Sequence, residues 1–229
     1  AQFYFFSIPE GAAYVRFSFA SNENTQYFKD INESLTMAEL MEHILITTGS
    51  GARVADKIPY RPDSLFKDEI WDSLGDSLTQ AQRYQKYVSA YYGLKGYHDN
   101  GIGGSTVSGT GANAFWQDAR VNALCPVADC ITIAGGTNDF GLTIGEVSLN
   151  NFDVTTFAGA YNTLLYKIYH RYGMLKTDRI IDSVDVSGTT QVESKNVRLF
   201  MIAPPYNDNN KDLTPYSEAV EAIGKLWGI

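Results

Sequence analysis

Three short apolar segments are each followed by a loop of small, polar or amide residues, and this pattern constrains the fold most. The loops are residues 73–79 (Ser-Leu-Gly-Asp-Ser-Leu-Thr), 101–106 (Gly-Ile-Gly-Gly-Ser-Thr) and 135–140 (Gly-Gly-Thr-Asn-Asp-Phe). A helical pattern follows each loop at varying distance, as expected for strands and helices that alternate in a parallel α/β sheet. Ligands of such sheets bind outside the carboxyl ends of the strands. We therefore predict that the three loops form one functional edge.

A doubly wound parallel sheet is predicted from about residue 63 to residue 229. The run Cys-Ile-Thr-Ile-Ala at 130–134 is apolar enough for a strand that is buried on both faces. Residues 182–196 are polar and are predicted to form an exposed insertion or hairpin. Strands are expected at residues 69–74, 97–100, 130–134 and 197–203, and helices at 80–92, 115–124, 157–172 and 217–227, the last capped by Ser217.

Residues 1–62 are predicted to form a separate β-rich segment that ends in a helix and a linker. Strands are expected at 3–8 and 13–20, a helix from Ser34 to about Ile46, and a linker at 49–63. A two-stranded hairpin cannot bury its aromatic side chains alone. It either packs on the main domain or ends a β-sandwich whose earlier strands are missing, and the abrupt start at Ala1 favours the second alternative. Residues 8–19 are similar to the final strands of β-sandwich modules in bacterial surface and phage tail proteins.

Composition excludes several classes of function. With 44% hydrophobic residues the 229-residue chain can form a sizeable core, and its net charge of -8 disfavours nucleic-acid and anionic-membrane binding. The apolar runs are too short to span a bilayer, and the first residues do not resemble a signal peptide. A disulfide between Cys125 and Cys130 would strain the strand at 130–134, so both thiols are expected to be free.

The three loops together resemble the motifs of the SGNH (GDSL-type) hydrolases over residues 69–229. Residues 75–78 (Gly-Asp-Ser-Leu) look like the first block, Gly104 like the glycine of the second, and residues 136–139 (Gly-Thr-Asn-Asp) like the third. The resemblance implies a three-layer α/β/α sandwich and ester hydrolysis through an acyl-enzyme. It also implies that Ser77 is the nucleophile, and that the N–H groups of Ser77 and Gly104 and the amide of Asn138 bind the oxyanion.

Elementary chemistry is compatible with these roles, although each residue has a simpler interpretation. A serine at a strand-to-helix turn lies near a helix N-terminus, where negative charge is favoured, but Ser77 could also be an ordinary helix cap. A glycine leaves its backbone N–H open to substrate, but the register among Gly101, Gly103 and Gly104 is not fixed by the sequence. Asn138 could be a turn-forming residue. We expect the neighbouring residues Asp76 and Asp139 to brace the loops.

The sequence departs from the family at its last block, Asp-x-x-His, which supplies the general base. None of the three histidines, His43, His98 and His170, stands in such a pattern, and only His98, at the end of a predicted strand, could approach the site. A serine without a base is a poor nucleophile. The chain ends at Ile229, where the family pattern calls for a fifth strand, so we expect the block to lie beyond it and this fragment to be inactive alone.

The sequence therefore predicts a serine esterase that acts on small acyl esters, with an O-acetyl group on a carbohydrate as the expected substrate. A lipid or aryl ester remains open. The alternative from another class is a non-catalytic glycan-binding or structural module of a phage tail or cell-surface assembly. We expect no metal and no cofactor, because His, Cys and carboxylates show no ligand spacing. The expected location is extracellular, on the cell surface or in a virion, and a larger assembly is compatible with the N-terminal segment.

Overall fold

The computed structural model describes residues 64–229, apart from residues 83, 177–180, 182 and 205–210. The chain divides into two units between Ile58 and Pro59, and every described residue belongs to the second unit. The strands expected at 3–8 and 13–20, the helix expected at 34–46 and the linker expected at 49–63 all lie outside the described residues.

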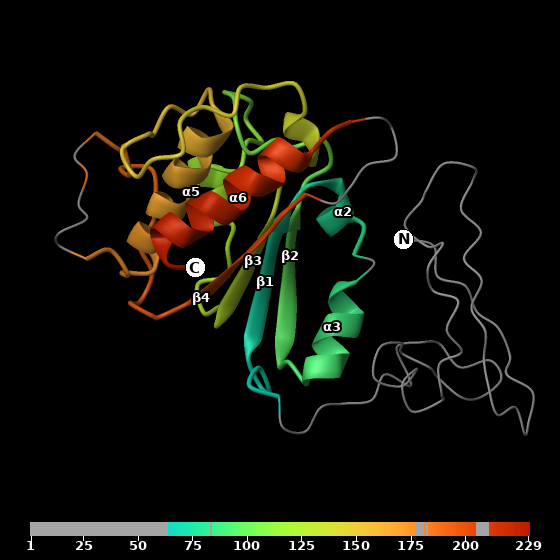
Figure 1. Cartoon of the computed structure of the whole chain (residues 1–229). Coiled ribbons are helices and arrows are strands. Elements are labelled where there is room, and N and C mark those ends of the chain that lie inside the picture. The colour runs from blue at the N-terminus through green and yellow to red at the C-terminus, as the bar shows by residue number, and fades with distance from the viewer. Residues whose placement is uncertain (1–63, 83, 177–180, 182, 205–210) are drawn as a thin grey trace, which may run out of the picture. The chain divides into compact units, whose positions relative to one another are not determined.

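Four parallel strands form the sheet at the centre of the described unit (Figure 1). The sheet has the order β2-β1-β3-β4, so β1 and β3 lie inside it and β2 and β4 at its ends. The predicted strands are confirmed, with ends that differ by one residue at most. Their bounds are Ile70–Gly75 for β1, Gly96–Gly101 for β2, Cys130–Ala134 for β3 and Arg198–Ile202 for β4.

Helices cover both faces of this sheet, which confirms the predicted three-layer α/β/α sandwich. Figure 1 shows α5 (Phe157–Arg171) and α6 (Thr214–Trp227) on one side and α3 (Gln85–Tyr92) on the other. The short helix α4 (Asp118–Asn122) packs against α5, which also packs against α6. No helix in the described part of the chain is long and apolar enough to cross a membrane.

The hydrophobic core is built around α5. Thirteen of its fifteen residues are buried, so it is surrounded by protein on nearly all sides rather than on a single stripe. Tyr161 and Phe157 are fully buried and their rings meet edge to face at 5.5 Å. The Thr156 side chain accepts a hydrogen bond from the N–H of Gly159 and so caps the helix. Helix α4 packs against this buried helix.

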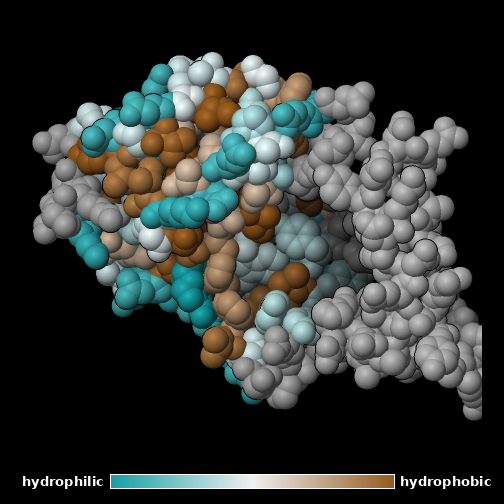
Figure 2. All heavy atoms as spheres, viewed as in Figure 1, coloured by the Kyte–Doolittle hydropathy of each residue, from teal (hydrophilic) through white to brown (hydrophobic). Residues whose placement is uncertain are grey.

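The opposite face of the sheet is aromatic and less completely covered. Trp71 of β1 packs near Tyr84 and Tyr97, and Phe66 lies between Tyr92 of α3 and Phe200 of β4. The side chains of Phe200 and Ile202 on β4 are 39% and 41% exposed. Figure 2 shows hydrophobic residues at the surface among polar ones.

The helix predicted at residues 80–92 is wrong in its extent, because two helices occupy this region. Helix α2 covers only Ser77–Gln80, and α3 begins at Gln85. Gln82 has a left-handed backbone with φ of 49°, which a continuous right-handed helix does not permit. The first helix therefore starts at Ser77 itself and is a single turn.

The predicted start of the last helix is also wrong. Helix α6 begins at Thr214, whose N–H donates to the carboxylate of Asp212 at 3.0 Å, and Leu213 is the residue before its first turn. Ser217 lies inside the helix, where its hydroxyl donates to the carbonyl oxygen of Leu213 at 3.2 Å. Pro215 near the start explains the difference, because a proline is well tolerated in the first helical turn.

Two other predictions need smaller corrections. The helix predicted at 115–124 is confined to α4, and the described residues 183–196 contain turns and no strand, so no hairpin forms there. This segment is not simply exposed: Val184 and Thr189 are buried, and the Thr189 hydroxyl donates to Asp118 at 2.7 Å. Cys125 and Cys130 are both buried and free, as expected.

Candidate active site

The strand register brings the three loops to one edge of the sheet. Gly75, the last residue of β1, is paired with Gly101 at the end of β2 and with Ala134 at the end of β3. Because the strands are parallel, the chain leaves all three at the carboxyl edge. The segments that carry Ser77, Gly104 and Asn138 therefore begin from adjacent backbone positions.

Ser77 is the first residue of α2 and its side chain is exposed. The carboxylate of Asp76, one residue earlier, accepts a hydrogen bond from the N–H of Leu78 at 2.9 Å and caps the helix. Asp76 rather than Ser77 is thus the N-cap, which removes the simplest alternative role for the serine. The N–H of Ser77 makes no hydrogen bond within the described part of the chain. The hydroxyl and the N–H of Ser77 are both open to a ligand.

The turn around Ser77 is closed by tight packing that only glycine permits. A Cβ atom on Gly75 would lie 1.9 Å from Oγ1 of Thr79, and one on Gly101 would lie 2.1 Å from the backbone N of Gln80. Helix α2 therefore sits directly on the ends of β1 and β2. The first two loops are locked together by this contact.

The structure distinguishes the three glycines of the second loop, which the sequence left unresolved. Gly101 packs beneath α2. Gly103 faces the loop of Ser77, since a Cβ atom there would lie 3.8 Å from Cβ of Ser77, and its N–H donates to Oε1 of Gln80 at 2.8 Å. Gly104 has φ of +73°, and its N–H makes no hydrogen bond in the described region. Gly104 thus keeps an unused donor, whereas the donor of Gly103 is occupied.

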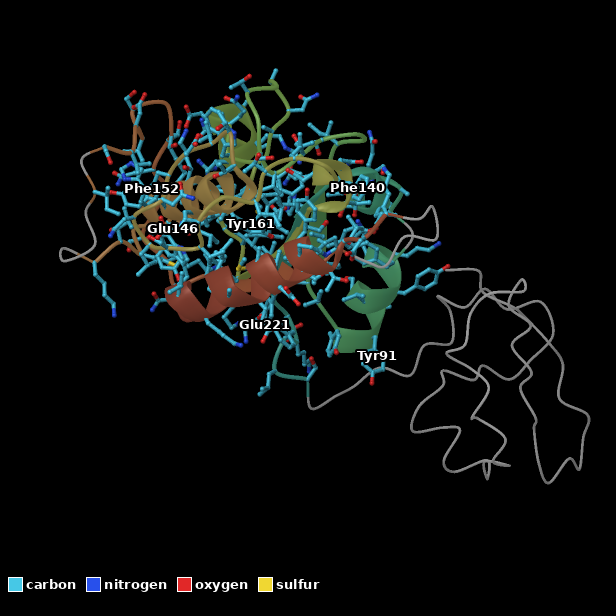
Figure 3. The ribbon with its side chains drawn as sticks, turned by 45° about the horizontal axis from the view of Figure 1, so that its top comes forward. Tyr91, Phe140, Glu146, Phe152, Tyr161 and Glu221 are labelled. Atoms are coloured by element: carbon cyan, nitrogen blue, oxygen red, sulfur yellow. The ribbon has the colours of Figure 1, made fainter. Side chains whose placement is uncertain are left out.

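Asn138 joins the third loop to the second. It lies in the 3-10 helix η3 (Thr137–Asp139), half-buried, and its Nδ2 atom donates to the carbonyl oxygen of Ser105 at 2.9 Å. Ser105 directly follows Gly104, so this bond holds the amide beside the glycine. A side-chain amide carries two N–H donors, which leaves one of them for a ligand. In Figure 3, Phe140 marks the position immediately after η3 at this end of the sheet.

The neighbouring aspartates brace the loops, as expected. Asp139 is fully buried and accepts hydrogen bonds from the N–H groups of Val107 and Ser108 at 2.9 and 2.8 Å and from the Ser108 hydroxyl at 2.6 Å. Burial raises the pKa of Asp139 above its usual value in spite of these bonds. Burial also raises the pKa of Asp76, and the charge of Asp139 raises it further. The two carboxyl groups are therefore close enough to interact.

Neither described histidine lies where a base for Ser77 would be needed. His98 is in the middle of β2, three residues before Gly101, which at about 3.3 Å per residue is roughly 10 Å from the strand end. Its predicted place at the end of the strand is therefore wrong, because β2 continues to Gly101. His170 lies in the last turn of α5. His43 is outside the described residues.

Sequence reasoning missed two residues of this site, Gln80 and Arg120. Gln80 occupies the N–H of Gly103 through its side chain, and Arg120 of α4 donates from an Nη atom to the carbonyl oxygen of Gly75 at 2.9 Å. An arginine in a polar helical segment usually indicates a solvated surface, so no local signal distinguishes it. Within the described residues no cluster of three or more His, Cys, Asp or Glu side chains could hold a metal ion.

Comparisons with known proteins give likeness in structure only. No protein-family model matches the sequence, and no curated protein is significantly similar to it. A crystal structure of a protein from Lactobacillus plantarum matches with a TM-score of 0.52 and 21% identity over 71% of this chain and 75% of that one. A possible lipase from Chitinophaga pinensis matches with a TM-score of 0.50 and 19% identity over 70% of this chain and 65% of that one.

A third structure, named "putative GDSL-like lipase" and from Bacteroides uniformis, has a lower TM-score of 0.47 at 18% identity, over 71% of this chain and 81% of that one. At such identities a likeness establishes the fold alone. The described unit therefore shares the three-layer α/β/α fold of the first two of these structures, and its three motif-bearing loops lie at the carboxyl edge of its sheet.

Proposed function

We propose that the described unit is a serine ester hydrolase in which Ser77 attacks the acyl carbon of the substrate. The observation that carries the proposal is the set of unused donors at one edge of the sheet. The N–H groups of Ser77 and Gly104 lack acceptors in the described region, and one N–H of the Asn138 amide remains available after its bond to Ser105. Such donors, fixed before the reaction starts, are what a tetrahedral oxyanion requires.

The proposed reaction has two steps. In the first, Oγ of Ser77 forms a bond to the acyl carbon while its proton goes to a base, and the negative oxygen of the intermediate accepts from the three donors. Collapse of the intermediate expels the alcohol and leaves an ester on Ser77. In the second, water attacks that ester and releases the acid. The short helix α2 and the loop of Gly104 contribute positioning, because neither has to move to form the oxyanion site.

We further propose that the substrate carries a small acyl group, such as an O-acetyl group on a carbohydrate. The support for this is the open setting of Ser77, whose side chain is exposed at the start of a one-turn helix. A bulky polysaccharide could approach a serine in that position. An acetylated oligosaccharide should therefore be hydrolysed at least as well as a long-chain lipid ester.

The test compares hydrolysis of p-nitrophenyl acetate by the wild type and by Ser77→Ala, with Ser89→Ala on α3 as the matched control. Because neither His98 nor His170 is within reach of Ser77, we expect low turnover that added imidazole raises by serving as the base. Ser77→Ala should remain at background with and without imidazole, and Ser89→Ala should behave like the wild type. Asn138→Ala should lower kcat about a hundredfold, as for the loss of one oxyanion donor.

Two results would contradict the proposal. Equal turnover of wild type and Ser77→Ala would mean that another group attacks. High turnover without imidazole that disappears in His98→Ala would instead identify His98 as the base. That result would contradict the inference drawn from the position of His98 in the middle of β2.

A further inference from the structure

Arg120 is a buried cation that no carboxylate neutralises within the described residues. Its side chain is 4% exposed, its guanidinium lies 5.3 Å from the ring centroid of Phe115, and it takes part in no ion pair in the described region. Its Nε atom is buried without a partner. Burial lowers the pKa of Arg120, an effect that the charge of Asp99 partly offsets. Burying a charge without a counter-charge lowers the stability of the fold, because the attraction of a partner does not offset the lost hydration.

The hydrogen bond that Arg120 makes connects it to the candidate active site. Its Nη2 atom donates at 2.9 Å to the carbonyl oxygen of Gly75, which also accepts from the N–H of Ile102 at 3.0 Å. Gly75 is two residues before Ser77, and Ile102 is two residues before Gly104. One carbonyl oxygen, held by one guanidinium, thus links the two loops that carry the proposed nucleophile and one proposed oxyanion donor.

We propose that Arg120 is a positioning residue that fixes the Ser77 turn and the Gly104 loop through the Gly75 carbonyl and favours negative charge at this edge. The inference rests on the proposed function of Ser77. The cation is poorly solvated, so its field is weakly screened where an oxyanion would form. It also opposes the negative charge of Asp99, which would otherwise disfavour an oxyanion.

The chain offers a matched control in Arg171 of α5. This arginine is also 4% exposed and has a buried Nε atom without a partner. Its guanidinium donates to the carbonyl oxygens of Thr190, Asn122 and Leu124. These carbonyls belong to chain segments outside the three site loops, and Leu124 precedes the amino end of β3. A purely structural role would make the two arginines equivalent in their effects.

The experiment uses phenylboronic acid, whose trigonal boron forms a B–O bond with a serine hydroxyl. The hydroxyl proton passes to the buffer and boron becomes a tetrahedral anion, so the adduct resembles the charged intermediate without needing turnover. Boron-11 NMR measures the affinity of the full 229-residue chain, with Ser77→Ala to prove the site of attachment. Urea denaturation of every variant measures the loss of stability separately.

We expect Arg120→Met to weaken the affinity at least tenfold and to shift adduct formation to higher pH, since the serine must then give up its proton without a nearby cation. Arg171→Met, which removes more hydrogen bonds, should lose at least as much stability but change the affinity less than twofold. If Arg120→Met does not fold, Arg120→Lys and Arg171→Lys provide the same comparison, because an ammonium cannot reproduce the geometry of the guanidinium.

The outcomes separate this inference from the function on which it rests. Equal affinities for the paired Arg120 and Arg171 variants, with a normal adduct in the wild type, would overturn the role of Arg120 alone. An adduct that is absent from the wild type, or unchanged in Ser77→Ala, would overturn the proposed nucleophile and the inference with it.

Discussion

The two halves of the candidate site are held by different forces. Around Ser77 and Gly103 the loops after β1 and β2 are locked by close packing, in which glycines at 75 and 101 leave no space for a Cβ atom. Around Asn138 the loop after β3 is held by polar side chains, with Asp139 accepting three hydrogen bonds and Asn138 donating one. The stability of the first half should therefore fall when a side chain is enlarged, and that of the second half when a hydrogen-bond acceptor is removed.

The difference follows from the part of the site that each half positions, a short helix in the first and a side-chain amide in the second. The turn at Ser77 has to bring a short helix onto the ends of two adjacent strands, which requires backbone to approach backbone. The third loop has to hold an amide beside Gly104, and side-chain hydrogen bonds across about thirty residues of sequence do this without close backbone contact. Three predictions test the contrast.

The largest effect is expected from Asp139→Ala. It leaves the N–H groups of Val107 and Ser108 and the Ser108 hydroxyl without their acceptor, and an unsatisfied buried donor costs about 1–3 kcal/mol. Because rearrangement relieves part of this, we expect the free energy of unfolding to fall by about 3–4 kcal/mol. Urea denaturation measures it. Asp153→Ala, at an exposed aspartate that also accepts bonds from a neighbour, is the control and should lose much less.

The second prediction addresses the packed half. Gly101→Ala places a Cβ atom 2.1 Å from the backbone N of Gln80, which cannot rotate away, so α2 must shift. We expect a loss of about 2–3 kcal/mol in the free energy of unfolding, as for overpacking in a core. Gly96→Ala on the same strand meets nothing within 4 Å and should change the stability by less than about 0.5 kcal/mol. Similar losses at both glycines would show that close packing is not the cause.

The smallest effect is a pH dependence in the polar half. Burial raises the folded-state pKa of Asp139 above its unfolded value of 3.8, so its protonated form is favoured by folding. Its contribution to stability is present below pH 3.8 and is lost as the pH rises through the folded-state pKa. The stability advantage of the wild type over Asp139→Asn should therefore shrink as the pH rises from below 3.8 towards neutrality. An advantage that grows over this range would mean that the hydrogen bonds outweigh the cost of burial.

Much of the scaffold could be predicted because its signals are local. The apolar run at 130–134 coincides with β3, and the stripe at 157–172 with α5 apart from one residue at its end. The helix at 80–92 could not be predicted correctly, because it is interrupted by the left-handed backbone of Gln82. A glutamine gives no sequence signal for that conformation. The cap at Ser217 failed because Asp212 and Pro215 begin α6 three residues earlier.

By itself the sequence determined the parallel sheet and the order of its loops, because short apolar runs and the residue types that follow them are local signals. The resemblance to the SGNH motifs made Ser77, Gly104 and Asn138 the candidates. Only the tertiary structure decided which glycine faces Ser77, that His98 lies partway along β2 and that Arg120 is buried against Gly75. Each of these depends on contacts between residues more than twenty positions apart, and the register of neighbouring strands sets them rather than the local sequence.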